Sequence, residues 1–308
     1  MKAKVPLSVL AVVALLLIAC AAAATPTSTP VPSRATPRPA ATPALVPPTA
    51  TPTKTPPETA GPKIQEIKNR GMLIISVKKE ESPTGQHRDV AHFQKRDFEI
   101  SLAKAIAKTL LGDENKVEVK MYPLADRVPA VERNEVDLAI SAISISEELK
   151  KIVNFSDPYA WEGLTLMARK GAGITGLEGL KGQTVAATTE GGRYFGNDIE
   201  RIAQERGLAI TAKSYGDFEE AASAVETGQA RAVIHRSIDI LVYMAQKPGV
   251  FETVGGTLSR EEYGIAIKKG NDDLLRLVNS VISELKKSGE IKQLAERAKF
   301  PAQHIALP

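Results

Sequence analysis

The stretch from Met72 to Tyr122 decides the fold class, because it reads as strand, helix and strand in turn. Met72–Val77 (MLIISV) is a short apolar run of the kind found in a buried strand. Asp97–Leu111 (DFEISLAKAIAKTLL) repeats apolar residues at helical spacing, and Asp97 can cap its first turn. Val117–Tyr122 (VEVKMY) alternates apolar and polar residues and predicts a second strand. A helix between two strands is the repeating unit of a mostly parallel sheet.

The same alternation continues along the rest of the chain. Further strands are predicted over 136–140, 164–168, 184–187, 210–214, 232–235 and 263–267. Further helices are predicted over 125–133, 193–205, 218–227, 237–245, 271–288 and 290–299. Strands that alternate with helices in this way indicate βαβ units, so the sequence predicts an α/β protein.

The N-terminus has the layout of a secretion signal. Lys2 and Lys4 precede an apolar stretch over 5–19, which is shorter than the roughly 20 residues of a membrane-spanning helix. Residues 17–20, Leu-Ile-Ala-Cys, resemble the lipobox of bacterial lipoproteins. That resemblance implies a signal peptide over 1–19, its removal, and a lipid on Cys20. The alternative is ordinary cleavage within 21–24, with Cys20 discarded. Because Cys20 is the single cysteine, an intramolecular disulfide is excluded.

The segment that follows is predicted to be a disordered stalk. Ala21–Pro62 is almost entirely Ala, Thr, Pro and Ser and holds twelve of the twenty prolines. It lacks the apolar residues that would offset the entropy lost on ordering. Together with Cys20 it forms a predicted anchor and stalk over 20–62, able to reach on the order of 100 Å when extended.

The formal net charge of +4 comes from this N-terminal part. Residues 1–62 contain five Lys or Arg and one Glu, so the chain from 63 onward is close to neutral. A near-neutral folded part offers no basic field for nucleic acid. Its length, about 245 residues, suits two small lobes or one large domain.

Six short motifs in the predicted folded part occur in the order in which one known family carries them. As a set they resemble the bacterial extracellular solute-binding proteins of family 3, which serve amino-acid ABC importers. The motif most similar to its family counterpart is Asn154–Tyr159 (NFSDPY). The other five are Ile67–Gly71, Asp97–Ala103, Val136–Ala139 with the Ser-Ile-Ser of 144–146, Leu177–Gly182 and Tyr263–Gly270. The resemblance covers residues 63–300.

The resemblance implies a periplasmic-binding-protein-like fold of type II, in which two α/β lobes are joined by two crossover hinge strands. Lobe 1 would comprise 63–160 and 261–308, and lobe 2 would comprise 161–260. A ligand can contact both lobes only when the lobes are closed, so ligand binding favours the closed conformation. A permease can then recognise that conformation. The implied protein is a lipid-anchored, monomeric solute-binding component of an ABC importer. It would act at the extracytoplasmic face of the bacterial membrane without metal or other cofactor.

Three positions depart from the family pattern. The arginine that grips the carboxylate of an amino acid falls at Leu149, and leucine offers no such contact. The two acids that hold the ammonium group fall at Lys78 and Arg236. A ligand ammonium would be repelled there, so we expect a small polar solute that is anionic or amino-acid-like, with a preference for net negative charge.

Seven residues are predicted to bind the ligand: Lys78, Ser144, Ser146, Thr189, Gly192, Arg193 and Arg236. Ser144 takes the place of the family's pocket threonine. Residues 189–192 precede a predicted helix, where backbone N–H groups favour an anion. The alternative for each charged residue is a solvated or ion-paired surface group. The insert Lys79–Arg96 is either a lid or plain surface, and its His87 and His92 are weak evidence for a metal.

Two other functions remain open from the sequence. Some relatives on this scaffold are enzymes of the cyclohexadienyl dehydratase type, and here Arg193 and Arg236 could bind carboxylates while Glu190 acts as the acid. A ligand-sensing module is the other alternative. The solute-binding component is the main interpretation.

Overall fold

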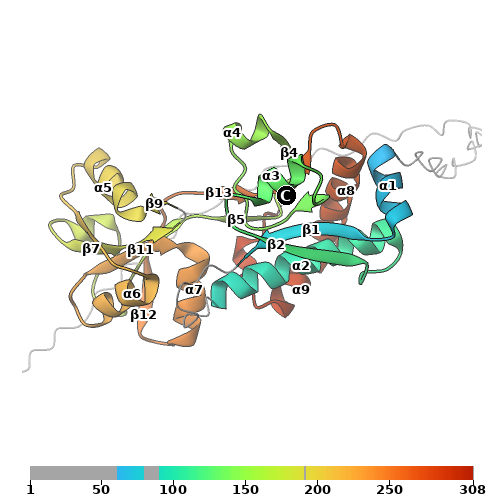
Figure 1. Cartoon of the computed structure of the whole chain (residues 1–308). Coiled ribbons are helices and arrows are strands. Elements are labelled where there is room, and N and C mark those ends of the chain that lie inside the picture. Colours follow the sequence, from blue (N-terminus) through green and yellow to red (C-terminus); the bar gives the residue numbers. More distant parts are fainter. Residues whose placement is uncertain (1–60, 80–89, 191, 308) are drawn as a thin grey trace, which may run out of the picture. The chain divides into compact units, whose positions relative to one another are not determined.

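The structure is a computed structural model, and it describes residues 61–79, 90–190 and 192–307 (Figure 1). The predicted signal peptide over 1–19, Cys20 and the stalk up to Ala60 lie outside the described residues. The α-helices of the described residues are α1 (Pro62–Arg70), α2 (Val90–Leu111), α3 (Arg127–Glu132), α4 (Glu147–Lys150), α5 (Phe195–Glu205), α6 (Phe218–Glu226), α7 (Ser237–Gln246), α8 (Asp272–Ser288) and α9 (Glu290–Arg297). Short 3₁₀ turns lie at η1 (Leu177–Leu180) and η2 (Ala302–His304).

The strands form two five-stranded sheets and two short pairs. They are β1 (Leu73–Lys78), β2 (Val117–Tyr122), β3 (Leu138–Ala139), β4 (Val153–Phe155), β5 (Ala160–Glu162), β6 (Leu164–Arg169), β7 (Thr184–Ala187), β8 (Thr189–Glu190), β9 (Arg193–Tyr194), β10 (Thr211–Ser214), β11 (Ala232–Arg236), β12 (Phe251–Thr257), β13 (Glu261–Tyr263) and β14 (Ala266–Lys268).

The first sheet has the order β2-β1-β3-β14-β4. Strand β1 pairs in parallel with β2 and β3, while β14 runs antiparallel to β3 and β4. The apolar run in β1 is buried because Leu73, Ile75 and Val77 pack with Phe98 and Leu102 of α2. Helices α2, α8 and α9 contribute half of the remaining buried apolar residues of this core (Figure 1).

The second sheet has the order β10-β7-β11-β6-β12. Strand β7 is parallel to β10 and β11, and β6 is antiparallel to β11 and β12. Its core is divided between two groups of buried residues. One contains Phe195 and Ile199 of α5, and the other contains Ala221 and Val225 of α6.

Two antiparallel strands carry the chain between the sheets. The chain leaves the first sheet through β5, and it returns through β13, which pairs with β5 in register. Gly163, just after β5, lies so close to Ser259 that a Cβ there would overlap the Ser259 carbonyl oxygen. The expected two-lobe α/β fold with two crossover strands is therefore confirmed.

Helix α7 follows β11 of the second sheet but also packs on the first. Its Ile238 and Val242 belong to the same buried group as Phe98 and Leu102 of α2. Residues 161–260, which contain α7, therefore also pack apolar side chains into the core of the first sheet.

Helix α2 starts earlier than the sequence predicted, at Val90 rather than at Asp97. Asp97 lies in the middle of the helix and caps nothing. The first turns are held by tertiary contacts instead, since Ala91 is buried in the core and the Lys95 ammonium pairs with Asp239 of α7. The last part of the Lys79–Arg96 insert is thus helix, while residues 80–89, which include His87, lie outside the described residues.

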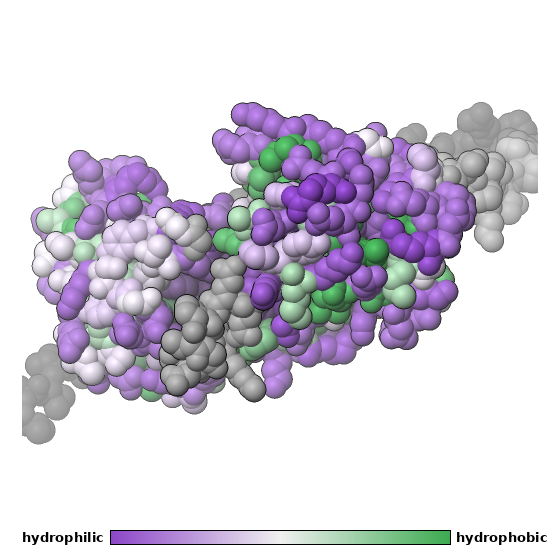
Figure 2. All heavy atoms as spheres, in the orientation of Figure 1, coloured by the Kyte–Doolittle hydropathy of each residue, from purple (hydrophilic) through white to green (hydrophobic). Residues whose placement is uncertain are grey.

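Polar and charged residues cover most of the face drawn in Figure 2, and apolar residues appear there in small groups. Exposed large apolar side chains include Val119 and Met121 on the edge strand β2. Among the described helices, none is both long and apolar enough to cross a membrane.

Candidate functional site

A cavity of about 240 Å³ lies where strands of both sheets end. Lys78 ends β1 of the first sheet, Arg236 ends β11 of the second, and Glu162 and Tyr263 come from the crossover strands. Most of its lining is titratable: Lys78, His92, Lys95, Arg96, Glu99, Arg127, Glu162, Glu190, Arg193, Arg236 and Tyr263. Ligands of α/β proteins bind at the ends of strands, which is the position of this cavity.

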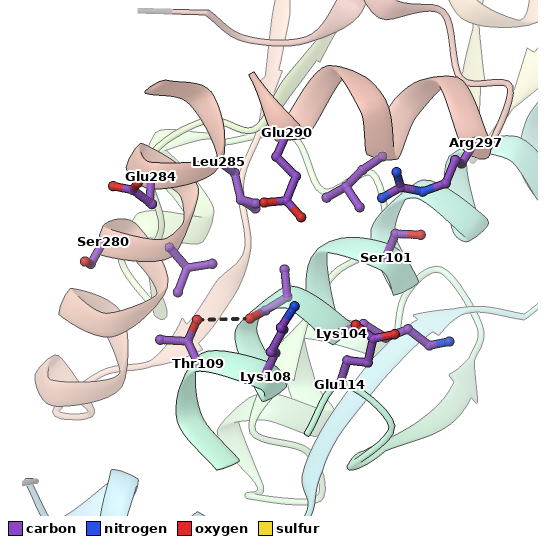
Figure 3. Close-up of a pocket in the computed structure, with 13 residues that line it drawn as sticks. Ser101, Lys104, Lys108, Thr109, Glu114, Ser280, Glu284, Leu285, Glu290 and Arg297 are labelled. Carbon is purple, nitrogen blue, oxygen red and sulfur yellow. Dashed lines mark hydrogen bonds between the residues drawn. The ribbon is translucent and has the colours of Figure 1, made fainter. Parts of the chain in front are cut away.

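A larger hollow of about 510 Å³ lies between α2, α8 and α9 (Figure 3). Its charged residues, which include Lys104, Lys108, Glu290 and Arg297, are all exposed to solvent. All of them except Glu114 come from α2, α8 and α9, and none lies at the carboxyl end of a strand. The smaller cavity instead contains buried charged groups, and it is therefore the candidate site despite its size.

The Arg236 guanidinium lies at the centre of the site and faces three carboxylates. Its Nε is 2.6 Å from Glu190 Oε2, and its Nη1 is 3.5 Å from Glu162 Oε2 and 3.7 Å from Glu261 Oε2. Burial alone would lower the pKa of Arg236, but electrostatic interactions with Tyr263, Glu190 and Glu162 raise it well above its usual value. The guanidinium is therefore permanently charged and already surrounded by acids.

A second group of charges lies between α2 and α7. The Lys95 Nζ is 3.0 Å from Asp239 Oδ1 and 3.7 Å from Glu162 Oε1. Burial acts to raise the pKa of Asp239, but Lys95 and the nearby His235 outweigh it and hold that pKa far below its usual value. Glu162 is fully buried, which raises its pKa, and it accepts a hydrogen bond from the Tyr263 hydroxyl.

Glu99 and Arg127 form the wall on the side of the first sheet. Glu99 Oε1 accepts hydrogen bonds from the Ala142 N–H at 2.5 Å and from the Tyr159 hydroxyl at 2.6 Å. Its burial raises its pKa. Arg127 donates to the carbonyl oxygens of Ser141 and Leu124, so it braces the loop after β3.

Three of the seven predicted ligand-binding residues line the cavity: Lys78, Arg193 and Arg236. Each cation has an acidic partner there. Lys78 Nζ is 3.9 Å from Glu190 Oε1, and Arg193 forms a two-pronged pair with Asp198 and a 2.7 Å pair with Glu261. The structure thus brings the predicted bases together but places acids between them.

The other four predicted residues are not among the lining residues. Ser144 donates a 2.9 Å hydrogen bond to Glu261, one contact away from Arg236. Ser146 caps α4, where its side chain accepts from the Leu149 N–H. Thr189 is exposed and pairs with Tyr194 through the β8–β9 strands. Gly192 is exposed too and adopts a left-handed backbone, with a φ of 80°.

The helix that follows residues 189–192 begins later than the sequence predicted. Helix α5 begins at Phe195 rather than Arg193, because Arg193 pairs with Glu190 in the β8–β9 strands. The Phe195 N–H already donates to the Thr188 carbonyl oxygen at 3.0 Å. Leu149, where the family arginine was expected, packs on a small apolar group of the first sheet.

Sequence reasoning missed the acids of the site. Glu162, Glu261 and Asp239 were not singled out, and Glu190 appeared only as a possible catalytic acid. The available signal was that Glu162 lies two residues before the strand predicted over 164–168, and Glu261 two residues before the strand predicted over 263–267. Within the described residues, no group of three or more His, Cys, Asp or Glu side chains is arranged to hold a metal ion.

Comparison with known proteins agrees with the fold. The model of the family "Bacterial extracellular solute-binding proteins, family 3" matches residues 74–300. The chain therefore belongs to this family, whose proteins bind solutes outside the cell.

Named relatives and solved structures fall in the same class. The chain is 28% identical to the ABC transporter glutamine-binding protein GlnH of Bacillus subtilis over 78% of this chain and 85% of that protein. It is 32% identical to the glutamine-binding protein of Geobacillus stearothermophilus over 67% and 76% of the two chains. A solved ancestral cationic amino acid solute-binding protein matches at 27% identity with a TM-score of 0.59, covering 76% of this chain and 98% of the other.

Proposed function

We propose that this chain is the solute-binding component of an ABC importer, held at the outer face of the membrane by a lipid on Cys20. Its ligand is a small polar solute that carries a carboxylate, either an anion or an amino-acid-like molecule. It binds in the cavity lined by Lys78, Arg193 and Arg236. The binding partner that receives the solute is the membrane permease, and the binding protein itself acts as a monomer.

The observation that supports this proposal is that two cations from different sheets face one carboxylate. Arg236 ends β11 and Lys78 ends β1, and both contact the carboxylate of Glu190, at 2.6 and 3.9 Å. A carboxylate is therefore favourable at that point. A ligand carboxylate placed there would touch both sheets at once, and contacts of this kind shift a two-lobe protein toward closure.

The acids of the site also bear on which ligands fit. Lys78 and Arg236 do not face the cavity as free positive charges, because Glu190, Glu162 and Glu261 lie beside them. A ligand ammonium near these acids would be attracted as well as repelled. Amino acids therefore remain in the proposed ligand class. Several relatives are named for amino acids, among them glutamine, L-cystine, and glutamate with aspartate.

Calorimetry on the purified chain tests this proposal. We expect one member of a panel of L-glutamine, L-cystine, L-glutamate, L-arginine and succinate to bind at micromolar concentration. Lys78→Met should weaken that binding about tenfold, since it removes one charge-assisted contact. The matched control is Lys213→Met, at an exposed lysine of β10 that is not part of the cavity. Equal affinities in Lys78→Met and the control would contradict the proposed site.

The enzymatic alternative is less well supported, because the pKa of Glu190 does not suit the general acid that this reaction requires. One solved relative is described as a precursor of cyclohexadienyl dehydratase, at 28% identity and a TM-score of 0.53. Burial and Asp239 act to raise the pKa of Glu190, but Arg236 and Lys95 outweigh them and hold it below its usual value. A general acid needs its proton at neutral pH, so Glu190 is poorly suited to that role. Turnover of prephenate or arogenate by the purified chain would favour the enzyme.

A further inference from the structure

The carboxylate of Glu190 occupies the point between the two cations to which the proposed function assigns the ligand. Its Oε2 lies 2.6 Å from Arg236 Nε, and its Oε1 lies 3.9 Å from Lys78 Nζ. The residue is carried by β8, a strand of two residues whose one partner strand among the described residues is β9. Its side chain is 33% exposed, although it lines the cavity.

The other two acids beside Arg236 are held by further donors. Glu162 is fully buried and accepts from the Tyr263 hydroxyl and from the Ile238 N–H. Glu261 accepts from the Ser144 hydroxyl at 2.9 Å and from Arg193 at 2.7 Å. Both carboxylates therefore have structural partners that fix them in place.

Glu190 differs because its carboxylate contacts the two cations themselves. The hydrogen bond and ion pairs that this carboxylate makes in the described part of the chain are those with Lys78 and Arg236. A partly exposed acid on a two-residue strand can move away at lower cost than a buried acid in a crossover strand. Of the three acids around Arg236, Glu190 is the one that a competing group can replace.

A ligand carboxylate cannot simply be added to this arrangement. Arg236 already faces three acids, and a fourth carboxylate at the same point would be repelled by all of them. The repulsion is strong because the site is partly dry. Entry of a ligand carboxylate therefore requires one acid to leave, and the contacts above identify Glu190 as that acid.

We propose that Glu190 is a specificity-determining residue that acts as a tethered carboxylate, occupying the ligand's carboxylate position until the ligand displaces it. This inference rests on the proposed function, because it takes Lys78 and Arg236 as the ligand's cations. A tethered group competes at a high effective concentration. The apparent affinity for any carboxylate is lowered by the fraction of molecules in which Glu190 fills the site.

The tethered carboxylate also selects among ligands. A simple anion only replaces the contacts that Glu190 already makes, so it gains little. A solute that adds contacts elsewhere in the cavity, for example to Arg127 or Glu99, gains more than it displaces. Because this competition lowers the affinity of every carboxylate by the same factor, a small anion becomes too weak to be retained, while a solute with further contacts still binds.

The test uses Glu190→Gln in the full chain, with calorimetric titration of succinate, L-glutamate and L-glutamine. The amide keeps the shape of the side chain but loses its negative charge. We expect succinate and L-glutamate to bind Glu190→Gln at least about tenfold more tightly than they bind the unmodified chain, because the competing carboxylate is removed. The matched control is Glu178→Gln, which removes the same charge at an exposed position of η1, outside the cavity. The control should bind as the unmodified chain does.

A second variant guards against an effect on folding. Glu190→Asp keeps the charge but draws the carboxylate back by one methylene, so its affinities should fall between those of the unmodified chain and Glu190→Gln. Melting temperatures of all variants would be compared with that of the unmodified chain.

Each remaining outcome overturns a specific claim. If the unmodified chain binds a probe and Glu190→Gln binds it no more tightly, Glu190 is not a competitor, while the proposed function stands. If Glu190→Gln binds L-glutamine or L-glutamate more weakly, Glu190 holds the ligand's ammonium group instead. If no protein binds any probe, the cation pair is not a carboxylate site, and both the inference and the proposed ligand class fail.

Discussion

Lys95 and Asp239 form a 3.0 Å ion pair that joins α2 to α7, although 144 residues separate them in the sequence. Both side chains are almost completely buried. Lys95 also approaches the buried Glu162, and Glu162 in turn faces Arg236, which binds the ligand in the proposed function. A single lysine thus neutralises acids that belong to two different elements.

We expect Lys95→Met to lower the free energy of unfolding by about 3 kcal/mol, because removing one partner of a buried pair leaves the other charge uncompensated. Two acids, Asp239 and Glu162, would lose a cation at once. Urea denaturation measures the change. Lys150→Met, which breaks an exposed pair with Glu147, is the control and should cost no more than about 1 kcal/mol. Similar losses in the two variants would show that burial of the Lys95 pair is unimportant.

The fluorescence of Trp161 should report an unusually acidic histidine. The Trp161 and His304 rings are 4.3 Å apart, and Trp161 is the single tryptophan of the chain. Burial lowers the pKa of His304 to about 4, with Lys95 and Arg260 acting in the same direction against the Trp161 carbonyl. Since a protonated imidazole quenches indole, the folded chain should lose fluorescence around pH 4.

The same shift gives a pH dependence of stability. The unfolded chain protonates this histidine below about pH 6.5, and the folded chain does so only near pH 4. The folded state therefore binds fewer protons in that window, and the free energy of unfolding falls as the pH is lowered through it. In His304→Asn the fluorescence step should disappear and the fall in stability should be smaller. A native-state midpoint near the unperturbed value would contradict the assigned environment.

Gly163→Ala should be destabilising at the crossing between the two sheets. A Cβ at Gly163 would overlap the Ser259 carbonyl oxygen, which is backbone and cannot rotate away. We expect a loss of about 2–4 kcal/mol in thermal or urea unfolding. Gly216→Ala is a suitable control, because its Cβ would meet only the end of the flexible Glu220 side chain at 3.0 Å. A neutral Gly163→Ala variant would mean that β5 and the segment around Ser259 can move apart freely.

Cys20→Ala should release the protein from the membrane. Acyl chains contribute roughly 0.8 kcal/mol per buried CH₂, so the lipids expected on Cys20 would dominate the anchoring. Fractionation of cells that express the variant, followed by a high-salt wash, measures the change. Persistence of the variant in the washed membrane fraction would contradict lipid anchoring through this residue.

The sequence predicted those elements whose burial pattern is local. Strands β1, β2 and β7 lie within one residue of their predicted bounds, since alternation or an apolar run marks them directly. Strand β3 is much shorter than the predicted 136–140, because its extent depends on its neighbours β1 and β14. The start of α2 was placed seven residues late, since the contact of Lys95 with Asp239 that supports the first turns is not local.

The sequence predicted the basic residues of the site but not its acidic residues. Lys78 and Arg236 follow the predicted strands of two different lobes, so motif register was enough to place both at the cleft between the lobes. Glu162 and Glu261 come from β5 and β13, two strands whose pairing brings together residues about a hundred positions apart. Short sequence patterns carry no information on such pairing. The inferred preference for a net negative ligand was therefore made without the charges that oppose it.

Helix α7 connects the occupancy of the cavity to packing far from it. Arg236 is the residue immediately before this helix, whereas Ile238 and Val242 are packed in the core of the first sheet. Any rearrangement that moves Arg236 relative to Lys78 must carry α7 with it and slide that helix across α2. Sliding of packed helices allows small displacements and resists large ones. The distance that Arg236 can move relative to Lys78 is thus limited by the packing of α7 against α2. Bending of the two strands that cross between the sheets is a second, separate limit.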